Sequence, residues 1–181
     1  TQIAMYTTEC AILHVLQEKR ISYEAAAGLS LGEYAALTAA GALSFKDGCH
    51  VIRRRGIYME QAVPEGQGSM AAVLGLSAKQ TEEVLKTSLD TAKIGIANYN
   101  CPGQIVITGE TKAVEEASER LKEAGARRVI PLKVRGPFHS KMLTGAGEEL
   151  KKVLDTVKIN TPSVPYVANV NASYVDSDSE I

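Results

Sequence analysis

The sequence predicts an α/β protein in which a small second unit is inserted into the first. Three observations lead to this fold class. A Gly28-x-Ser30-x-Gly32 stretch stands between a short run of small residues and a helix-forming run. After a linker at 64–68 the hydrophobic period changes, and strand and helix signals alternate to about residue 132. A helix signal and a strand signal then follow, which predicts a discontinuous first unit.

The first unit is expected to begin with a helix over 5–19, closed by Lys19 and Arg20. A short strand within 21–27 then leads to Ser30, although its alanines are poor strand formers. The helix after Ser30 stops at Gly41, and Ser44 with Asp47 predicts the N-terminal cap of another helix. Beyond the insert we expect a helix over 141–157 and a strand over 166–170.

The inserted unit is predicted from the order of its elements. Pro131 should place the last strand at a sheet edge or end it early. The order strand–helix–strand–strand–helix–strand is the ferredoxin-like arrangement, so 67–132 is interpreted as a small subdomain within a core formed by 1–66 and 133–181. The predicted strands are 69–76, 94–99, 104–108 and 128–132, and the predicted helices are 78–89 and 111–124.

The overall composition excludes several function classes. The chain has 181 residues, a 45% hydrophobic content and a net charge of −1, which argues against nucleic-acid binding. No apolar run approaches the length of a membrane span. The three cysteines and three histidines are widely spaced, so neither a metal site nor a disulfide framework is indicated. We therefore expect a cytoplasmic protein without a metal or other cofactor.

Ser30 is the candidate nucleophile. A nucleophilic serine must project into a cleft, so the turn that carries it is sharp, and flanking glycines remove side chains that would collide there. The N–H groups and the positive dipole end of the following helix favour a developing oxyanion. The alternative is a plain turn, since a Gly-x-Ser-x-Gly pattern is short.

Arg55 is a candidate anion-binding residue. It shares one helix face with Gly48, Ile52, Met59 and Val63, while the neighbouring arginines point elsewhere. An arginine in an apolar stripe needs an anionic partner, because an unpaired buried charge is costly. It either clamps a substrate carboxylate, or it pairs with a structural carboxylate or extends to solvent.

His139 is the candidate general base. It stands in a Pro-containing loop before a helix, from which a side chain can reach a cleft, whereas His14 and His50 lie in predicted helices. An ordinary surface histidine is the alternative.

Four ordered motifs over essentially the whole chain resemble the malonyl-CoA:acyl carrier protein transacylase family and the acyltransferase domains of fatty-acid and polyketide synthases. The resemblance implies a hydrolase-like core with a parallel sheet and a nucleophile elbow. It also implies malonyl transfer from malonyl-CoA to the phosphopantetheine thiol of acyl carrier protein, in support of fatty-acid synthesis. The motifs are Gly28-Leu29-Ser30-Leu31-Gly32-Glu33-Tyr34, Arg55-Gly56-Ile57-Tyr58-Met59, Asn98-Tyr99-Asn100-Cys101-Pro102-Gly103-Gln104 and Gly136-Pro137-Phe138-His139-Ser140.

The resemblance also implies a role for each matched residue. Ser30 would attack the malonyl thioester with His139 as general base, and a malonyl-serine ester would form. Arg55 would bind the free malonyl carboxylate, and the backbone N–H of Leu31 would be one oxyanion donor. Met59 and Phe138 would shape the acyl pocket, and Asn98 would lie near the site.

The sequence departs from the family pattern in two ways. Leu29 stands where the family usually has histidine. An opening strand with a Gly-Gln-Gly segment, and a later segment that orients the histidine, have no counterpart. We therefore expect an internal portion of a longer chain.

A basic cluster follows the insert's second helix. It consists of Arg127, Arg128, Lys133 and Arg135. We interpret it either as a solvated face or as a docking patch for the acidic carrier protein.

Three other functions compete with malonyl transfer in fatty-acid synthesis. One is an acyltransferase domain of a polyketide synthase. A serine esterase or hydrolase of the α/β-hydrolase type would need an acid before His139, and no convincing one is present. A non-enzymatic carrier-binding module would leave the combination of Ser30, Arg55 and His139 unexplained.

Overall fold

The computed structural model describes the backbone of residues 1–181 and every side chain except that of Ser88. The chain divides into two compact units, one formed by Thr1–Ile57 with Glu149–Ile181 and the other by Tyr58–Glu148. The second unit is wider than the range 67–132 expected for the insert. The predicted boundaries themselves stay a prediction.

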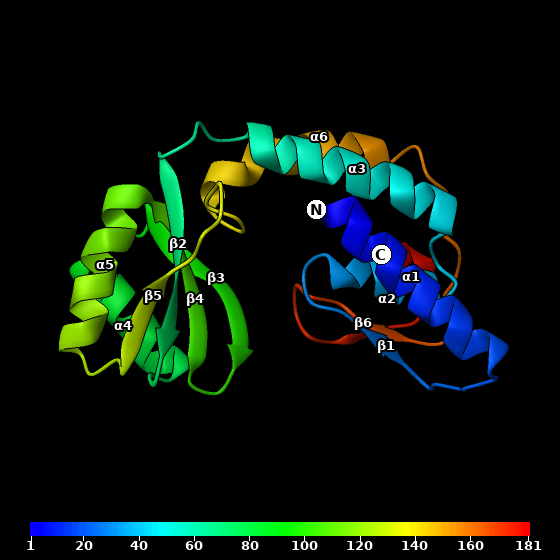
Figure 1. The fold of residues 1–181 in the computed structure, drawn as a ribbon, viewed down its shortest axis with the longest axis horizontal. Coiled ribbons are helices and arrows are strands. Elements are labelled where there is room, and N and C mark those ends of the chain that lie inside the picture. Colours follow the sequence, from blue (N-terminus) through cyan, green and yellow to red (C-terminus); the bar gives the residue numbers. More distant parts are fainter. The chain divides into compact units, whose positions relative to one another are not determined.

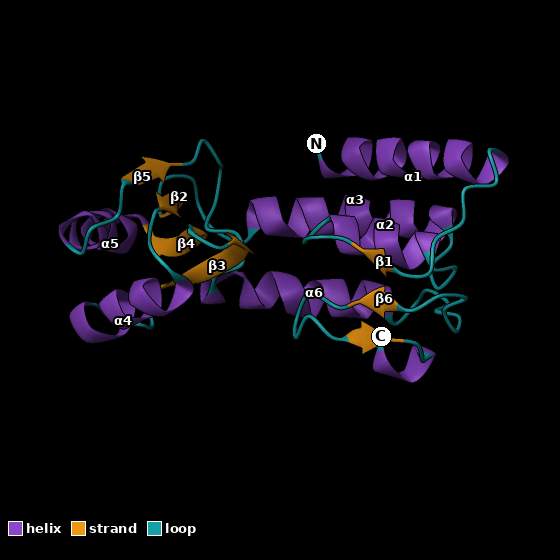
Figure 2. Cartoon of the chain, turned by 90° about the horizontal axis from the view of Figure 1, so that it is seen from below, coloured by secondary structure: helices purple, strands orange, loops and turns teal.

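The first unit combines helices with a small mixed sheet (Figures 1 and 2). Strand order is β1-β6-β7, with β1 and β6 parallel and β6 and β7 antiparallel. The expected parallel pairing therefore holds for β1 and β6. The strands are β1 (Ala26–Ala27), β6 (Tyr166–Val167) and β7 (Tyr174–Val175). The helices that belong to this unit wholly or in part are α1 (Gln2–Glu18), α2 (Gly32–Ala39), α3 (Phe45–Gln61), α6 (Thr144–Leu154) and the short 3₁₀ turn η2 (Asp178–Glu180); the unit boundaries fall within α3 and α6.

The buried face of α1 differs from the one its apolar spacing suggests. Tyr6 and Cys10 are buried, whereas Met5, Ile12 and Leu16 are exposed. The Tyr6 ring stacks on Phe45 with ring centroids 5.8 Å apart, and its hydroxyl lies 2.7 Å from Thr38 Oγ1. Burial raises the pKa of Tyr6. A neutral tyrosine thus joins α1 to α2 and α3.

The second unit is a four-stranded antiparallel sheet with two helices on one face (Figure 1). Its core lies between helices and sheet and is made of aliphatic side chains such as Val73, Ile107 and Leu121. Strand order is β3-β4-β2-β5. The elements are β2 (Gly68–Leu74), α4 (Ala78–Ser88), β3 (Ile94–Cys101), β4 (Gln104–Glu110), α5 (Thr111–Glu123), β5 (Arg128–Pro131) and the 3₁₀ turn η1 (Lys141–Leu143).

Local signals in the sequence explain several element ends. The Ser44 hydroxyl accepts the N–H of Asp47 at 3.0 Å and donates to its carboxylate, so the predicted cap of α3 is confirmed. Ser77 and Gln80 form a capping box at the start of α4. β5 ends at Pro131 and lies at the sheet edge, as the missing proline N–H requires.

Some predicted elements are shorter than expected. The strand expected within 21–27 is reduced to Ala26–Ala27, because alanines favour extended structure weakly. The helix expected over 141–157 begins as the 3₁₀ turn η1 and ends at Leu154. The strand expected over 166–170 stops at Val167, and β7 was not anticipated. No helix in the described part of the chain has the length and apolarity that a bilayer crossing requires.

The tight approach of Tyr6 to α3 yields a stability prediction. A Cβ at Gly48 would lie 1.9 Å from the Tyr6 hydroxyl oxygen, whereas a Cβ at Gly56 would meet Gln2 only at ordinary contact distance. We expect Gly48→Ala to lower the free energy of unfolding by about 1–3 kcal/mol through overpacking. Chemical denaturation of the purified protein measures the change.

Gly56→Ala on the same helix is the matched control. It should leave stability unchanged or raise it by up to about 1 kcal/mol, because alanine favours helix more than glycine does. Equal stability of the two variants would contradict the packing argument at Gly48.

Candidate active site

Ser30 lies in a sharp connection between β1 and α2, which we call the serine turn (residues 28–31). Its φ of 54° is in the left-handed region, which non-glycine residues seldom occupy. The turn is closed by successive backbone bonds, from the Gly32 N–H to the Leu29 carbonyl at 3.0 Å and from the Glu33 N–H to the Ser30 carbonyl at 3.3 Å. The serine therefore stands directly before the first turn of α2.

The two glycines of the motif have different roles. A Cβ at Gly28 would lie 2.0 Å from the Gly32 carbonyl oxygen, so no other residue fits there. A Cβ at Gly32 would meet nothing within 4 Å. The expectation that both glycines prevent collisions is thus right for Gly28 and wrong for Gly32, because the α2 backbone approaches the turn on one side.

Arg55 is buried, with 8% of its surface exposed, and its guanidinium faces the serine turn. Nη2 donates to Ser30 Oγ at 3.0 Å, and Nη1 donates to Gln2 Oε1 at 2.5 Å. The suggestion that Arg55 extends to solvent is therefore wrong. Among the described residues its hydrogen-bond partners are a hydroxyl and an amide, so its charge meets no carboxylate of the chain.

Tyr34 supplies a further contact for this buried charge. The Arg55 guanidinium carbon lies 5.7 Å from the centroid of the Tyr34 ring, a cation–π geometry. Burial raises the pKa of Tyr34, and the nearby Arg55 charge opposes that shift only in part. The ring therefore presents the face of a neutral phenol to the guanidinium.

Leu31 is the N-cap residue of α2, directly before the helix starts at Gly32. It is buried and has helical backbone angles, and the Tyr34 N–H donates to its carbonyl at 3.1 Å. Within the described residues, the Leu31 N–H itself has no hydrogen-bond acceptor. It is one of the initial helix N–H groups that lack an acceptor inside the helix, which suits a negatively charged oxygen.

Other residues around Ser30 were missed by sequence reasoning. Gln2 orients Arg55, Tyr34 covers it, and Asn169 Oδ1 accepts the Ser30 N–H at 2.6 Å. One signal was available for Asn169. It is a polar residue just after β6, whose carboxyl end lies beside that of the parallel strand β1, where the serine turn starts.

The remaining predicted site residues belong to the second unit. Met59 lies in α3, one helical turn after Arg55, and Asn98 lies in β3 beside a register shift. Phe138 and His139 lie in the loop after β5, and His139 has a φ of 60°. The structure thus groups Ser30, Leu31 and Arg55 in the first unit, and the other four residues in the second.

The loop that carries His139 is anchored within the second unit. Pro137 is buried, and a Cβ added at Gly68 would lie 2.3 Å from its ring. His139 lines a pocket of about 250 Å³ together with Thr108, whose hydroxyl is buried without a hydrogen-bond partner among the described residues. Ser140 caps η1 by accepting the Met142 N–H.

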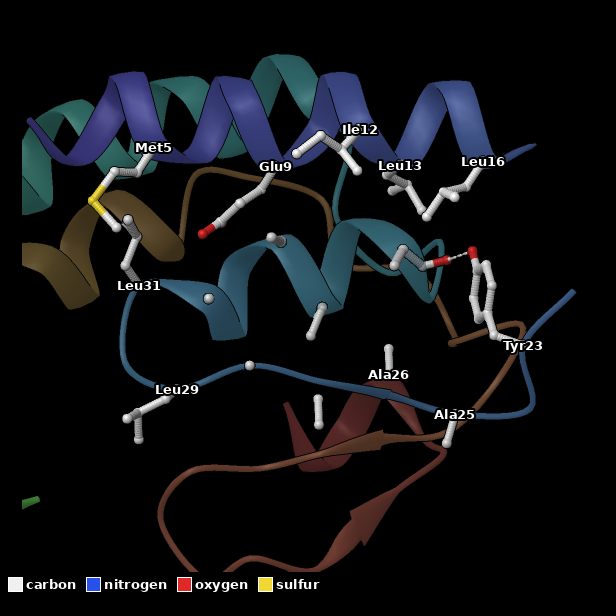
Figure 3. A pocket seen from close by; sticks show the side chains of 16 residues that line it. Met5, Glu9, Ile12, Leu13, Leu16, Tyr23, Ala25, Ala26, Leu29 and Leu31 are labelled. Atoms are coloured by element: carbon white, nitrogen blue, oxygen red, sulfur yellow. Dashed lines mark hydrogen bonds between the residues drawn. The ribbon is translucent and has the colours of Figure 1, made fainter. Parts of the chain in front are cut away.

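An apolar groove of about 600 Å³ is lined by α1, by the segment that leads to Ser30 and by α2 (Figure 3). Met5, Ile12 and Leu16 extend into it from α1, and Leu29 lines it with 60% of its surface exposed. Ser30 and Arg55 are not among the residues that line this groove.

The predicted docking residues Arg127, Arg128 and Lys133 are all exposed on the second unit. Arg135 of the same cluster pairs with Glu60 at 3.1 Å. No cluster of three potential metal ligands of the His, Cys, Asp or Glu type occurs among the described residues.

The chain is similar to proteins of known name. Curated malonyl CoA-acyl carrier protein transacylases match almost the whole chain, with 49% identity for the protein from Bacillus subtilis and 40% for that from Haemophilus influenzae. These matches cover 99% and 100% of this chain but only 57% and 59% of the relatives. The chain thus spans somewhat more than half of their length.

Solved structures give the same result. A type II PKS acyl-carrier protein in complex with its malonyl-transacylase matches with a TM-score of 0.95 and 38% identity. The protein MCAT from Streptococcus pneumoniae matches with a TM-score of 0.93 and 44% identity. Both matches cover 99% of this chain and 59% of the solved chain. The family described as the acyl transferase domain matches residues 1–179, and the chain therefore belongs to that family.

Proposed function

We propose that this chain contributes to the transfer of a malonyl group from malonyl-CoA to the phosphopantetheine thiol of an acyl carrier protein. The observation that carries the proposal is the buried Arg55 guanidinium, which donates to the hydroxyl oxygen of Ser30 and meets no carboxylate of the described chain. A malonyl group brings a carboxylate of its own to a nucleophile. The curated relatives are malonyl CoA-acyl carrier protein transacylases, and this supports malonyl-CoA as the substrate.

The proposed first step is formation of a malonyl ester on Ser30. The Ser30 oxygen attacks the thioester carbon while His139 accepts the hydroxyl proton. The tetrahedral oxyanion is stabilised by the Leu31 N–H at the start of α2. The carbon–sulfur bond then breaks, and coenzyme A leaves as a thiol with the proton that His139 returns.

The second step reverses this chemistry with another thiol. The pantetheine thiol of the carrier protein transfers its proton to His139 and attacks the ester carbon. The bond to Ser30 breaks, the serine regains its proton, and malonyl carrier protein is released. Arg55 holds the carboxylate through both steps with its planar pair of donors.

The local backbone supports roles for Ser30 and His139. Both have positive φ angles, together with only Arg20 and Ala172 among the non-glycine residues described. Such backbone is costly and concentrates at functional sites. By their match to the family motifs, Phe138 and Met59 are assigned to the acyl pocket, and Asn98 is assigned a place near the site. No metal or other cofactor takes part in the proposed reaction.

We further infer that the serine turn is a nucleophile elbow in a hydrolase-like core formed by 1–66 and 133–181. Support comes from the strand–turn–helix order and the parallel pair β1 and β6. The order of β2 to β5 with α4 and α5, and their antiparallel sheet, support a ferredoxin-like subdomain at 67–132.

The covalent intermediate provides the direct test. When the intact protein is incubated with malonyl-CoA, mass spectrometry of its peptides should find one malonyl group on Ser30. Ser30→Ala should abolish the adduct, whereas Ser173→Ala, a change at an exposed serine, should retain it. An unmodified Ser30 in the wild-type protein would refute the mechanism.

Arg55 should decide which acyl group is accepted. We expect Arg55→Ala to weaken malonyl transfer by about 2 kcal/mol or more, because the substrate carboxylate loses its bidentate partner. Acetyl transfer from acetyl-CoA should fall much less. The ratio of kcat/KM for the two substrates measures this selectivity.

Arg54→Ala is the control for that ratio, since Arg54 is exposed on the same helix. It should keep the preference of the wild type. If Arg55→Ala also kept the malonyl preference, Arg55 would not be the carboxylate-binding residue.

The exposed residues Arg127 and Arg128 should help to bind the acidic carrier protein. We expect the double change Arg127→Glu and Arg128→Glu to raise the apparent KM for acyl carrier protein roughly tenfold at low ionic strength, through repulsion of an acidic partner. The effect should shrink at high salt because mobile ions screen surface charges. Steady-state kinetics with varied carrier protein measures it.

Lys151→Glu with Lys152→Glu changes the net charge equally on α6 and is the control. It should leave the KM for carrier protein near the wild-type value. An unchanged KM in the Arg127 and Arg128 variant would exclude these residues from docking.

A further inference from the structure

We propose that Asn169 is a positioning residue that holds the serine turn in its reactive geometry, an inference that rests on the proposed function of Ser30. Asn169 lies two residues after β6, on a segment far from Ser30 in the sequence. It is exposed rather than part of a hydrophobic core. Its hydrogen bonds nevertheless converge on the serine turn.

The side-chain amide of Asn169 bridges the turn from one peptide group to another. Oδ1 accepts the Ser30 N–H at 2.6 Å, and Nδ2 donates to the Gly28 carbonyl at 2.5 Å. An N–H requires an acceptor and a carbonyl requires a donor, so these two partners determine the orientation of the amide. Asn169 thus ties together the two peptide groups that flank Leu29.

The backbone of Asn169 is held by α2. Its N–H donates to Glu33 Oε1 at 2.9 Å, and Glu33 belongs to the first turn of that helix. Asn169 is therefore connected to the strand side of the turn through Gly28 and to the helix side through Glu33. We call Asn169 and Glu33 the asparagine clamp.

The clamp has a consequence for the oxyanion. Because Asn169 occupies the Ser30 N–H, that group is not available to a substrate oxygen. The next N–H along the chain, that of Leu31, has no acceptor among the described residues. The clamp also offsets the cost of the left-handed backbone at Ser30, which must be held by surrounding contacts.

The test compares Asn169→Ala with Asn171→Ala in the intact protein. Asn171 is an exposed neighbour whose side chain accepts the Ser173 N–H and does not contact the turn. We expect Asn169→Ala to slow malonylation of Ser30 by about 100-fold, the size of effect seen when a reacting group is displaced by about 1 Å. The Asn171 variant should react at the wild-type rate.

Two readouts separate positioning from a general loss of structure. The dissociation constant for malonyl-CoA should stay within about twofold of wild type, because Arg55 is held by Gln2 and Tyr34 rather than by the clamp. Reaction of Ser30 with a fluorophosphonate, which carries no carboxylate, should slow in parallel with malonylation. A thermal unfolding curve verifies that each variant is folded.

Asn169→Asp gives a signature in pH. A carboxylate keeps an acceptor for the Ser30 N–H but presents a second oxygen to the Gly28 carbonyl, whereas a protonated carboxyl can again donate. Charged groups that hydrogen-bond to this region include Glu33, which accepts the N–H of residue 169, and Arg55, which donates to Ser30. We expect the malonylation rate of the aspartate variant, relative to wild type at each pH, to recover as the pH falls.

The outcomes separate the clamp from the function of Ser30. Slow malonylation of Asn169→Ala with unchanged malonyl-CoA binding, and recovery of the aspartate variant at low pH, would support the clamp. Wild-type malonylation by a folded Asn169→Ala variant would overturn the clamp and leave the proposed function standing. A wild-type protein that forms no malonyl-Ser30 would overturn the proposed function itself.

Discussion

The burial of the Arg55 guanidinium constrains how the other elements of the first unit pack. Arg55 is buried in α3, and a buried charge must be surrounded by groups that replace its lost hydration. Those groups come from separate elements: Gln2 at the start of α1, Ser30 in the serine turn and the Tyr34 ring in α2. The helices must therefore pack so that all three side chains reach one point. The Tyr6 contact with α3 keeps α1 in that position.

A second constraint is the strained backbone of the serine turn, which surrounding contacts must hold in place. Ser30 has a left-handed backbone, and Gly28 allows α2 to approach closely enough to begin directly after it. Asn169 and Glu33 hold this geometry with polar contacts rather than with a hydrophobic core. A hydrogen-bonded clamp has a distinct advantage over apolar packing, because it can assign each backbone N–H to a partner. It engages the Ser30 N–H, whereas the Leu31 N–H has no acceptor among the described residues.

In the second unit, local sequence patterns predict the order of the strands and helices. Its strands and helices follow the predicted order, since each element has a periodic apolar face and definite end signals such as the Ser77 cap and Pro131. Where such signals are weak, as in the alanines before Ser30, the extent of the strand could not be predicted. In α1 the aliphatic side chains of Met5 and Ile12 are exposed, and the buried side chains are Tyr6 and Cys10, which the pattern of one helix does not indicate.

The amino-acid sequence alone was enough to predict a mixed α/β fold, the order of most elements and the candidates Ser30, Arg55 and His139. Each of these depends on a short motif or on the period of one element, which is local information. The partners of Ser30 and Arg55 became visible in the three-dimensional structure alone. Gln2 is 53 positions from Arg55, and Asn169 is 139 positions from Ser30. No local pattern encodes such pairs, because they depend on how helices pack around a buried charge and on which parallel strands lie side by side.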